Sequence, residues 1–192
     1  LTIGSVADDP NKEFKEFTPF MEYIKENTPG IDAVKLKVFQ SIPAISAAIN
    51  NKEVDLYIDS PFSVEAVCLA TQAIPLWRRW KKGAKEYTSV IFNIKTTPAQ
   101  TLADLKGKVI AFEERYSSSS YLLPKFLMEK EGLKLLQINS LAERVPADSI
   151  GYIFTQDDAT TMFWVLRNKV AAGAMSNKNY VKKAKKRISK LN

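Results

Sequence analysis

The sequence predicts an α/β fold in two lobes, with parallel-rich sheets and helices on both sheet faces. Short apolar runs alternate with segments whose apolar residues recur at helical spacing, so that most predicted strands are followed by a helix. With 192 residues, of which 45% are hydrophobic and 26% charged, the chain can bury one core or two small ones. We expect a first lobe over residues 1–86, a second over 87–176, and a basic helical segment over 177–192 that returns toward the first lobe.

The first lobe contains three predicted strands, each followed by a helix. The strands are expected at residues 1–7, 33–39 and 54–58. The first helix should begin with Thr18 as its N-cap and Pro19 at its first position, and the third should begin at Ser60 and Pro61. Parallel strands present their carboxyl ends at one edge of a sheet, so Ser60 is expected at that edge.

The second lobe continues the alternation after a cationic connector. A strand should begin at Tyr87, and a helix capped by Asp157 or Asp158 should lie near the end. We interpret residues 139–156 as a mixed loop. The other predicted elements are a turn at Thr96-Thr97-Pro98, a helical turn at 101–107, strands at 108–112, 135–138 and 170–175, and a helix from Ser119 to about Glu131 that ends at Gly132.

Four consecutive serines, Ser117 to Ser120, lie between a short apolar strand and a helix with an apolar face. The first N–H groups of a helix lack intrahelical partners, and the helix dipole adds roughly half a positive charge there. Serine hydroxyls add further hydrogen-bond donors. The pattern predicts either an oxyanion site or, equally, one serine cap followed by solvated serines.

The composition excludes most common catalytic chemistry. The chain has no histidine and one cysteine, Cys68, in an apolar helical context typical of a structural thiol. A Ser-His-Asp triad, a zinc site of the usual Cys/His kind and a disulfide are therefore excluded. Glu113 and Glu114 are adjacent and project in different directions, which makes a poor acid/base pair. We expect a non-enzymatic protein without metal or cofactor.

No run approaches the roughly 20 apolar residues of a membrane span. Leu1 opens directly into a predicted strand, so we expect that any signal peptide or anchor is absent from this sequence.

Four stretches together resemble the phosphate/phosphite/phosphonate-binding proteins of ABC transporters, which have the type 2 periplasmic-binding fold. They are Asn51-Lys-Glu-Val-Asp-Leu56 ahead of Ser60-Pro61, Tyr87-Thr-Ser-Val-Ile91, Leu102-Ala-Asp-Leu-Lys-Gly-Lys-Val-Ile-Ala-Phe112, and Ser117-Ser-Ser-Ser-Tyr-Leu-Leu-Pro124. The last is the most specific, because it is similar to the family's Ser-Thr-Ser-Gly-aromatic-Leu-x-Pro turn.

The resemblance implies a periplasmic or extracytoplasmic monomer that closes two lobes over a small oxyanion and serves a membrane permease. It implies that Ser117, Ser118 and Ser119 hold the phosphonyl oxygens and that Tyr87 lines the same cleft. We expect Ser60 on the opposite side of this cleft.

Three positions depart from the family pattern. Ile42 stands where relatives can have tyrosine, Ser120 replaces a glycine, and Asp158 stands where some relatives have histidine. Asp158 is expected either to cap its helix or to face the cleft, where its carboxylate would accept a hydrogen bond from a hydroxyl or ammonium group of the ligand.

Two other functions are consistent with parts of the sequence. The same fold could be the extracytoplasmic sensor domain of a membrane signalling receptor. Alternatively, Trp77-Arg78-Arg79-Trp80-Lys81-Lys82 and the terminal lysines could form a nucleic-acid surface. We do not expect nucleic-acid binding, because the tryptophans are more simply explained by packing beneath the connector, and a net charge of +7 can also attract small anions.

Overall fold

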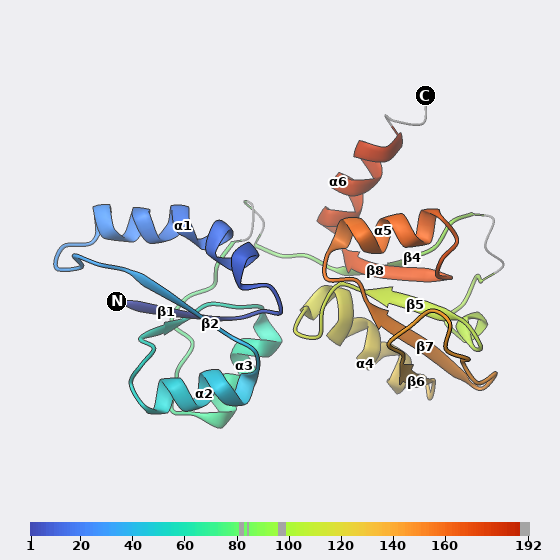
Figure 1. The fold of residues 1–192 in the computed structure, drawn as a ribbon, viewed down its shortest axis with the longest axis horizontal. Helices are drawn as coiled ribbons and strands as arrows, with labels where there is room; N and C mark the ends of the chain where they lie inside the picture. Colours follow the sequence, from blue (N-terminus) through green and yellow to red (C-terminus); the bar gives the residue numbers. More distant parts are fainter. Residues whose placement is uncertain (81–82, 84, 96–98, 189–192) are drawn as a thin grey trace. The chain divides into compact units, whose positions relative to one another are not determined.

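The computed structural model describes residues 1–80, 83, 85–95 and 99–188 (Figure 1). The chain forms two compact units, Leu1–Arg79 and Trp80–Asn192. The predicted turn at Thr96-Thr97-Pro98, Lys81 and Lys82, and the last residues of the basic segment lie outside the described residues. The basic segment forms helix α6 (Asn177–Ile188), which belongs to the second unit.

The first unit is a parallel three-stranded sheet in the order β2-β1-β3. Each strand is followed by a helix, which confirms the predicted alternation. The elements are β1 (Thr2–Val6), α1 (Pro10–Asn27), β2 (Lys35–Phe39), α2 (Ile42–Asn50), β3 (Leu56–Tyr57) and α3 (Pro61–Ala70). The core beneath α1 is formed by Ile3, Phe17 and Leu36.

Helix α1 begins earlier than predicted, so the assignment of Thr18 as its N-cap is wrong. The N-cap is Asp9, whose carboxylate accepts hydrogen bonds from the N–H groups of Asn11 and Lys12. The Thr18 hydroxyl instead donates to the carbonyl of Phe14 over 2.7 Å, and Pro19 lies inside the helix. Asp9-Pro10 carries the same cap-then-proline pattern as Thr18-Pro19, with a stronger capping residue at an earlier position.

The second unit is a five-stranded sheet in the order β4-β8-β5-β7-β6. Strand β4 is antiparallel to β8, and the other neighbours are parallel. The elements are β4 (Ser89–Phe92), η1 (Ala103–Leu105), β5 (Val109–Phe112), η2 (Ser118–Leu122), α4 (Leu123–Lys130), β6 (Lys134–Gln137), β7 (Ser149–Phe154), α5 (Asp158–Leu166), β8 (Ala172–Ser176) and α6.

Strand β7 contradicts the prediction of a mixed loop over residues 139–156. It is paired on both sides, with β5 and with β6, and its residues Ser149 to Ile153 are buried. Buried parallel strands read as continuous apolar runs without alternation, and here the run is interrupted by Gly151. A Cβ at Gly151 would come within 2.5 Å of the Val145 side chain, so glycine is needed where the loop packs on the strand.

Helices cover the two faces of this sheet (Figure 1). On β5, Ile110 and Phe112 point into the core under α4, whereas Ala111 points into the core under α5. This alternation follows the two-residue period of a strand. A Cβ at Gly173 on β8 would lie within 3.1 Å of Thr161 and Val165, so glycine lets α5 pack closely. The α/β class with parallel-rich sheets and helices on both faces is confirmed.

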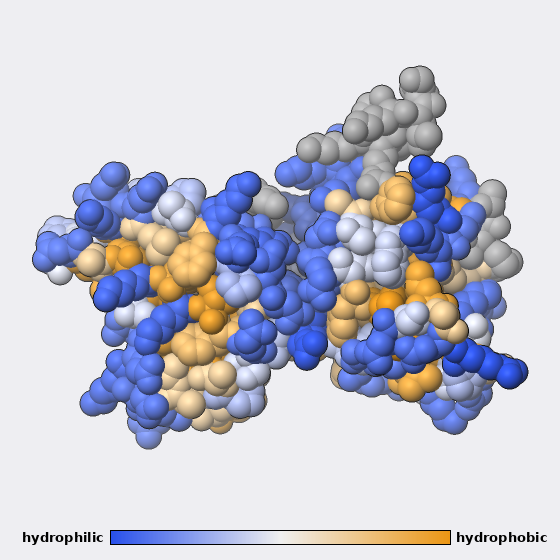
Figure 2. All heavy atoms as spheres, in the orientation of Figure 1, coloured by the Kyte–Doolittle hydropathy of each residue, from blue (hydrophilic) through white to orange (hydrophobic). Residues whose placement is uncertain are grey.

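Most of the surface visible in Figure 2 is hydrophilic, with hydrophobic patches on each unit. In the described part of the connector, the side chains of Trp77 and Trp80 are 85% and 60% exposed. The expectation that they pack beneath the connector is therefore wrong. Within the described ranges, no helix combines the length and apolar character needed to cross a membrane.

Candidate functional site

The serine turn, Ser117 to Ser120, begins the helix that follows β5. Ser117 is the N-cap, and its hydroxyl oxygen accepts a hydrogen bond from the N–H of Ser120 over 3.2 Å. Its carbonyl accepts from both Tyr121 and Leu122, so the first turn, Ser118–Leu122, has the wider π-helical geometry before it continues into α4. Such π-helical turns are frequent at functional sites.

Ser118 is the central residue of this turn. Its side chain is 3% exposed, and its hydroxyl oxygen has no hydrogen-bond partner among the described residues. A buried hydroxyl without a partner costs about 1–3 kcal/mol in desolvation. It lies in the first turn of a helix, where backbone N–H groups and the dipole also favour negative charge. The arrangement can therefore donate hydrogen bonds to an oxyanion.

Ser120 has a different role, because it ties the turn to the sheet. Its fully buried hydroxyl accepts from the N–H of Glu113 over 2.6 Å and donates to the carbonyl of Ala174 over 2.9 Å. The Ser89 hydroxyl at the start of β4 donates to the carbonyl of Ser119 over 2.6 Å. The turn is thus fixed to β5, β8 and β4, so its donors are held in place before any ligand arrives.

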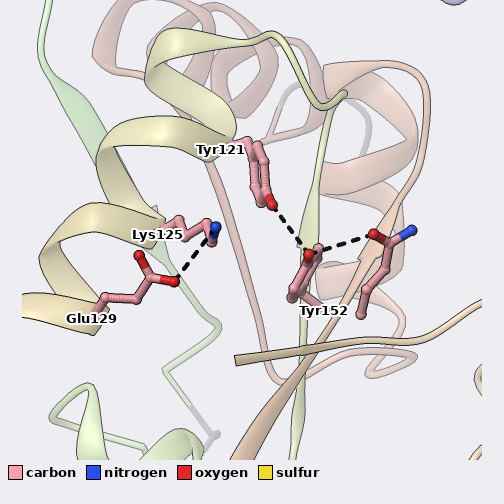
Figure 3. A network of polar contacts seen from close by, with 5 residues as sticks. Tyr121, Lys125, Glu129 and Tyr152 are labelled. Atoms are coloured by element: carbon pink, nitrogen blue, oxygen red, sulfur yellow. Dashed lines mark hydrogen bonds and ion pairs between the residues drawn. The ribbon is translucent and has the colours of Figure 1, made fainter. Parts of the chain in front are cut away.

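Tyr121, the residue directly after the serine turn, joins the same helix to Tyr152 on β7 (Figure 3). The hydroxyl of Tyr121 donates to that of Tyr152 over 3.1 Å, and Tyr152 donates to the side chain of Gln137 over 3.4 Å. Burial raises the pKa of Tyr121 well above its usual range, and the hydrogen bond to Tyr152 adds to this effect. On the solvent side, Lys125 and Glu129 form an ion pair over 3.4 Å.

Asp158 is the first residue of α5, directly after the loop that leaves β7. The N-cap of α5 is Asp157, so of the two aspartates predicted as the cap, Asp157 has this role and Asp158 does not. The side chain of Asp158 is 7% exposed, and its Oδ2 accepts a hydrogen bond from Nδ2 of Asn179 over 2.5 Å.

Asp157 stabilises the start of α5 through three hydrogen bonds. Its carboxylate accepts from the N–H groups of Ala159 and Thr160 and from the Thr160 hydroxyl. Partial burial by itself raises the pKa of Asp157, but the hydrogen bonds from Thr160 and Ala159, together with the charge of Lys183, outweigh it and hold the pKa below its usual range.

We predict that Asp157→Ala lowers the free energy of unfolding at neutral pH by about 0.5–2 kcal/mol, the usual cost of losing an N-cap. Because the folded-state pKa is depressed, this stabilisation is present above the unfolded pKa of about 3.9 and is lost as the pH falls through the folded pKa. Urea unfolding of both proteins at neutral and acidic pH checks this. A stability difference that does not shrink on acidification would contradict the assigned cap.

Hydrogen bonds and the pairing of β4 with β8 connect Asp158 with the serine turn around the end of β8. The N–H of Asn179 donates to the hydroxyl oxygen of Ser176 over 3.2 Å, and its side chain donates to Asp158. Ser176 is the register partner of Ser89, which in turn bonds Ser119. The structure therefore places the serine turn and Asp158 at the carboxyl edge of one sheet.

Tyr87 lies in the same unit, two residues before β4, and is half-buried. Ser60 lies in the first unit as the N-cap residue of α3, but its side chain makes no capping hydrogen bond. Ser60 and the serine turn belong to different units, and the cleft that they are predicted to share stays a prediction.

Sequence reasoning missed Asp59, which follows β3 at the carboxyl edge of the first unit's sheet. Its carboxylate accepts from the N–H of Ser60 over 2.6 Å and from the hydroxyl of Tyr57 over 3.0 Å. Burial raises the pKa of Asp59 above its usual range, and the nearby charge of Glu13 acts in the same direction. An aspartate directly after a short apolar strand was the available signal.

Across residues 1–80, 83, 85–95 and 99–188, no group of three or more Cys, Asp or Glu side chains could hold a metal ion.

Solved structures share this fold. A protein from Xanthomonas citri (XAC2383), solved bound to chloride and bound to ATP, matches with TM-scores of 0.81 and 0.80 at 20% and 18% identity. These matches cover 92% and 94% of this chain and 64% and 65% of the other. PhnD1 from Prochlorococcus marinus in complex with methylphosphonate matches with a TM-score of 0.66 at 18% identity, covering 98% of this chain and 68% of that one. The chain thus spans about two thirds of the length of these proteins.

The sequence itself matches a family model over residues 4–191. The family is described as "ABC transporter, phosphonate, periplasmic substrate-binding protein". The matched range includes the serine turn and Asp158, and the predicted resemblance is confirmed. The chain belongs to the family of periplasmic substrate-binding proteins of phosphonate ABC transporters.

Proposed function

We propose that this chain is the solute-binding component of an ABC transporter and binds a small oxyanion, a phosphonate or phosphate, at the serine turn. The observation that carries the proposal is the buried Ser118 hydroxyl without a hydrogen-bond partner among the described residues, in the first turn of a helix. An oxyanion would remove the desolvation cost of that hydroxyl. The protein would work outside the cytoplasm and deliver its ligand to a membrane permease.

The proposed ligand contacts are neutral donors. The hydroxyl of Ser117 accepts from the N–H of Ser120, and a hydroxyl that accepts still has its own proton to donate. The carbonyl of Ser119 accepts a hydrogen bond from the Ser89 hydroxyl. The N–H and the side chain of Ser119 lie in the first turn of the helix. Neutral donors bind an oxyanion firmly in a dry site yet allow release when the site opens, as transport requires.

Tyr87 and Ser60 remain proposed contacts of the same ligand. Tyr87 is supported by its position two residues from Ser89, whose hydroxyl holds the serine turn. Ser60 is supported by its position at the carboxyl edge of the first unit's parallel sheet, where such folds place their ligands. The family is one of transport proteins rather than enzymes, and we propose that this chain acts by binding alone, as a monomer.

A thermal-shift screen tests the proposed function. Methylphosphonate and inorganic phosphate are expected to raise the melting temperature, because a ligand present at about 100 times its Kd adds about 2.7 kcal/mol to the folded state. Acetate at the same ionic strength serves as the control for general anion effects. An unchanged melting temperature with every phosphonate and phosphate tested would contradict the proposal.

A further inference from the structure

Asp158 and the serine turn leave the sheet from neighbouring strands. The turn follows β5 and Asp158 follows β7, and these strands are parallel, with Phe112 opposite Phe154. Adjacent strands lie about 4.8 Å apart. The N–H of Thr155 donates to the carbonyl of Phe112 over 2.9 Å, so the pairing continues to the carboxyl ends of the strands from which both features follow. Asp158 therefore lies at the same edge as the serine turn.

A second path of contacts joins the two features around the other side of the edge. It runs from Asp158 through Asn179 to Ser176, and from Ser89 to the carbonyl of Ser119. An ion seated on the serine turn would therefore lie at the same edge of the sheet as Asp158.

The chemistry of Asp158 is opposite to that of the serine turn. The serines and the backbone N–H groups donate hydrogen bonds, whereas an ionised carboxylate can only accept them. Its burial is not explained by capping, because Asp157 caps α5. The helix start favours its negative charge, and Asn179 fixes its orientation through Oδ2. A fully deprotonated oxyanion beside it would be repelled.

We propose that Asp158 makes this site selective for oxyanions that carry a hydrogen-bond donor, either a protonated oxygen or an ammonium group. The proposal rests on the proposed function, since it assumes an oxyanion at the serine turn. The donor bonds the carboxylate of Asp158 while the remaining oxygens of the ligand accept from Ser118 and its neighbours. Buried polar groups that a wrong ligand leaves unpaired discriminate strongly between ligands of the same shape.

Calorimetric titrations at neutral pH with sulfate, inorganic phosphate and aminomethylphosphonate test whether the site prefers ligands with a hydrogen-bond donor. They also show whether that donor is a protonated oxygen or an ammonium group. Sulfate carries no proton, phosphate keeps at least one P–OH group, and aminomethylphosphonate adds an ammonium group. The wild-type protein is expected to bind phosphate or aminomethylphosphonate at least about tenfold more tightly than sulfate, as follows from a hydrogen bond to a charged group. Asp158→Asn should tighten sulfate binding and reduce this preference about tenfold or more.

The adjacent Asp157→Asn is the matched control, because asparagine keeps the cap while removing one charge, and it should preserve the wild-type preference. Loss of the phosphate preference in Asp158→Asn identifies the donor as P–OH, and loss of the aminomethylphosphonate preference identifies it as ammonium.

If the wild-type protein binds sulfate as tightly as both other ions, the selectivity proposal is overturned while the proposed function stands. This outcome is measured on the wild-type protein, so it does not depend on whether a variant folds. The selectivity proposal is equally overturned if Asp158→Asn, folded by circular dichroism, keeps the wild-type preference. If the wild-type protein binds none of the three ions or methylphosphonate, the proposed function itself fails.

Discussion

Replacing Ser118 with alanine is expected to weaken methylphosphonate binding by about 1.5–3 kcal/mol, roughly 10- to 150-fold in Kd. The hydroxyl is buried at a helix start and would donate to a charged ligand oxygen. No group among the described residues forms a hydrogen bond with this hydroxyl. Its removal therefore leaves none of these groups without a partner. The free energy of unfolding of the unliganded protein should therefore stay unchanged or rise slightly. Calorimetry and urea unfolding measure the two quantities.

Ser120→Ala is the matched control within the same turn. It removes a hydroxyl that bonds both the N–H of Glu113 and the carbonyl of Ala174, so it should lower the free energy of unfolding by about 1–3 kcal/mol. The two variants thus separate binding from stability. The account is contradicted if Ser118→Ala binds methylphosphonate like the wild type while Ser120→Ala behaves as expected.

Phe112→Ala should cause the largest loss of stability, about 3–5 kcal/mol. Phe112 is fully buried, and its ring centroid lies 5.3 Å from that of Tyr121 and 5.7 Å from that of Tyr152. Truncation leaves a cavity between β5, β7 and the start of α4 and removes both ring contacts. Because the chain has two compact units, unfolding should be followed with a probe in the second unit, such as fluorescence of Trp164.

Phe126→Ala on α4 is the control for this prediction. Its side chain is 64% exposed, and surface substitutions usually change stability by less than about 0.5 kcal/mol. Equal effects of the two substitutions would show that the core under α4 is not packed as described.

The sequence was sufficient to predict an element where its local pattern agrees with its tertiary packing. The strand that ends at Phe112, the serine turn and the left-handed Gly132 after α4 were all predicted from neighbouring residues, and the structure has them in place. Strand β7 was missed because its apolar run contains Gly151, which is needed for contact with Val145 rather than for a turn. That contact depends on how the preceding loop packs, which local periodicity does not report.

The candidate site, too, was only partly predictable from the sequence. The serine turn and Asp158 could be selected from the sequence, but the separate roles of the serines could not. Ser120 acts through Ala174, which lies 54 positions away in the chain, and Asp158 is held by Asn179. The capping role fell to Asp157 because only one of two adjacent aspartates can turn its carboxylate back to the N–H groups of Ala159 and Thr160.

The central claim, that the serine turn binds an oxyanion, is tested most directly by a crystal structure of this protein with methylphosphonate. The account predicts a phosphonyl oxygen within hydrogen-bond distance, about 2.5–3.0 Å, of the hydroxyl oxygen of Ser118, with backbone N–H groups of the first helical turn directed at the same group. A phosphonyl group bound away from the serine turn, with the Ser118 hydroxyl still lacking a partner, would contradict it.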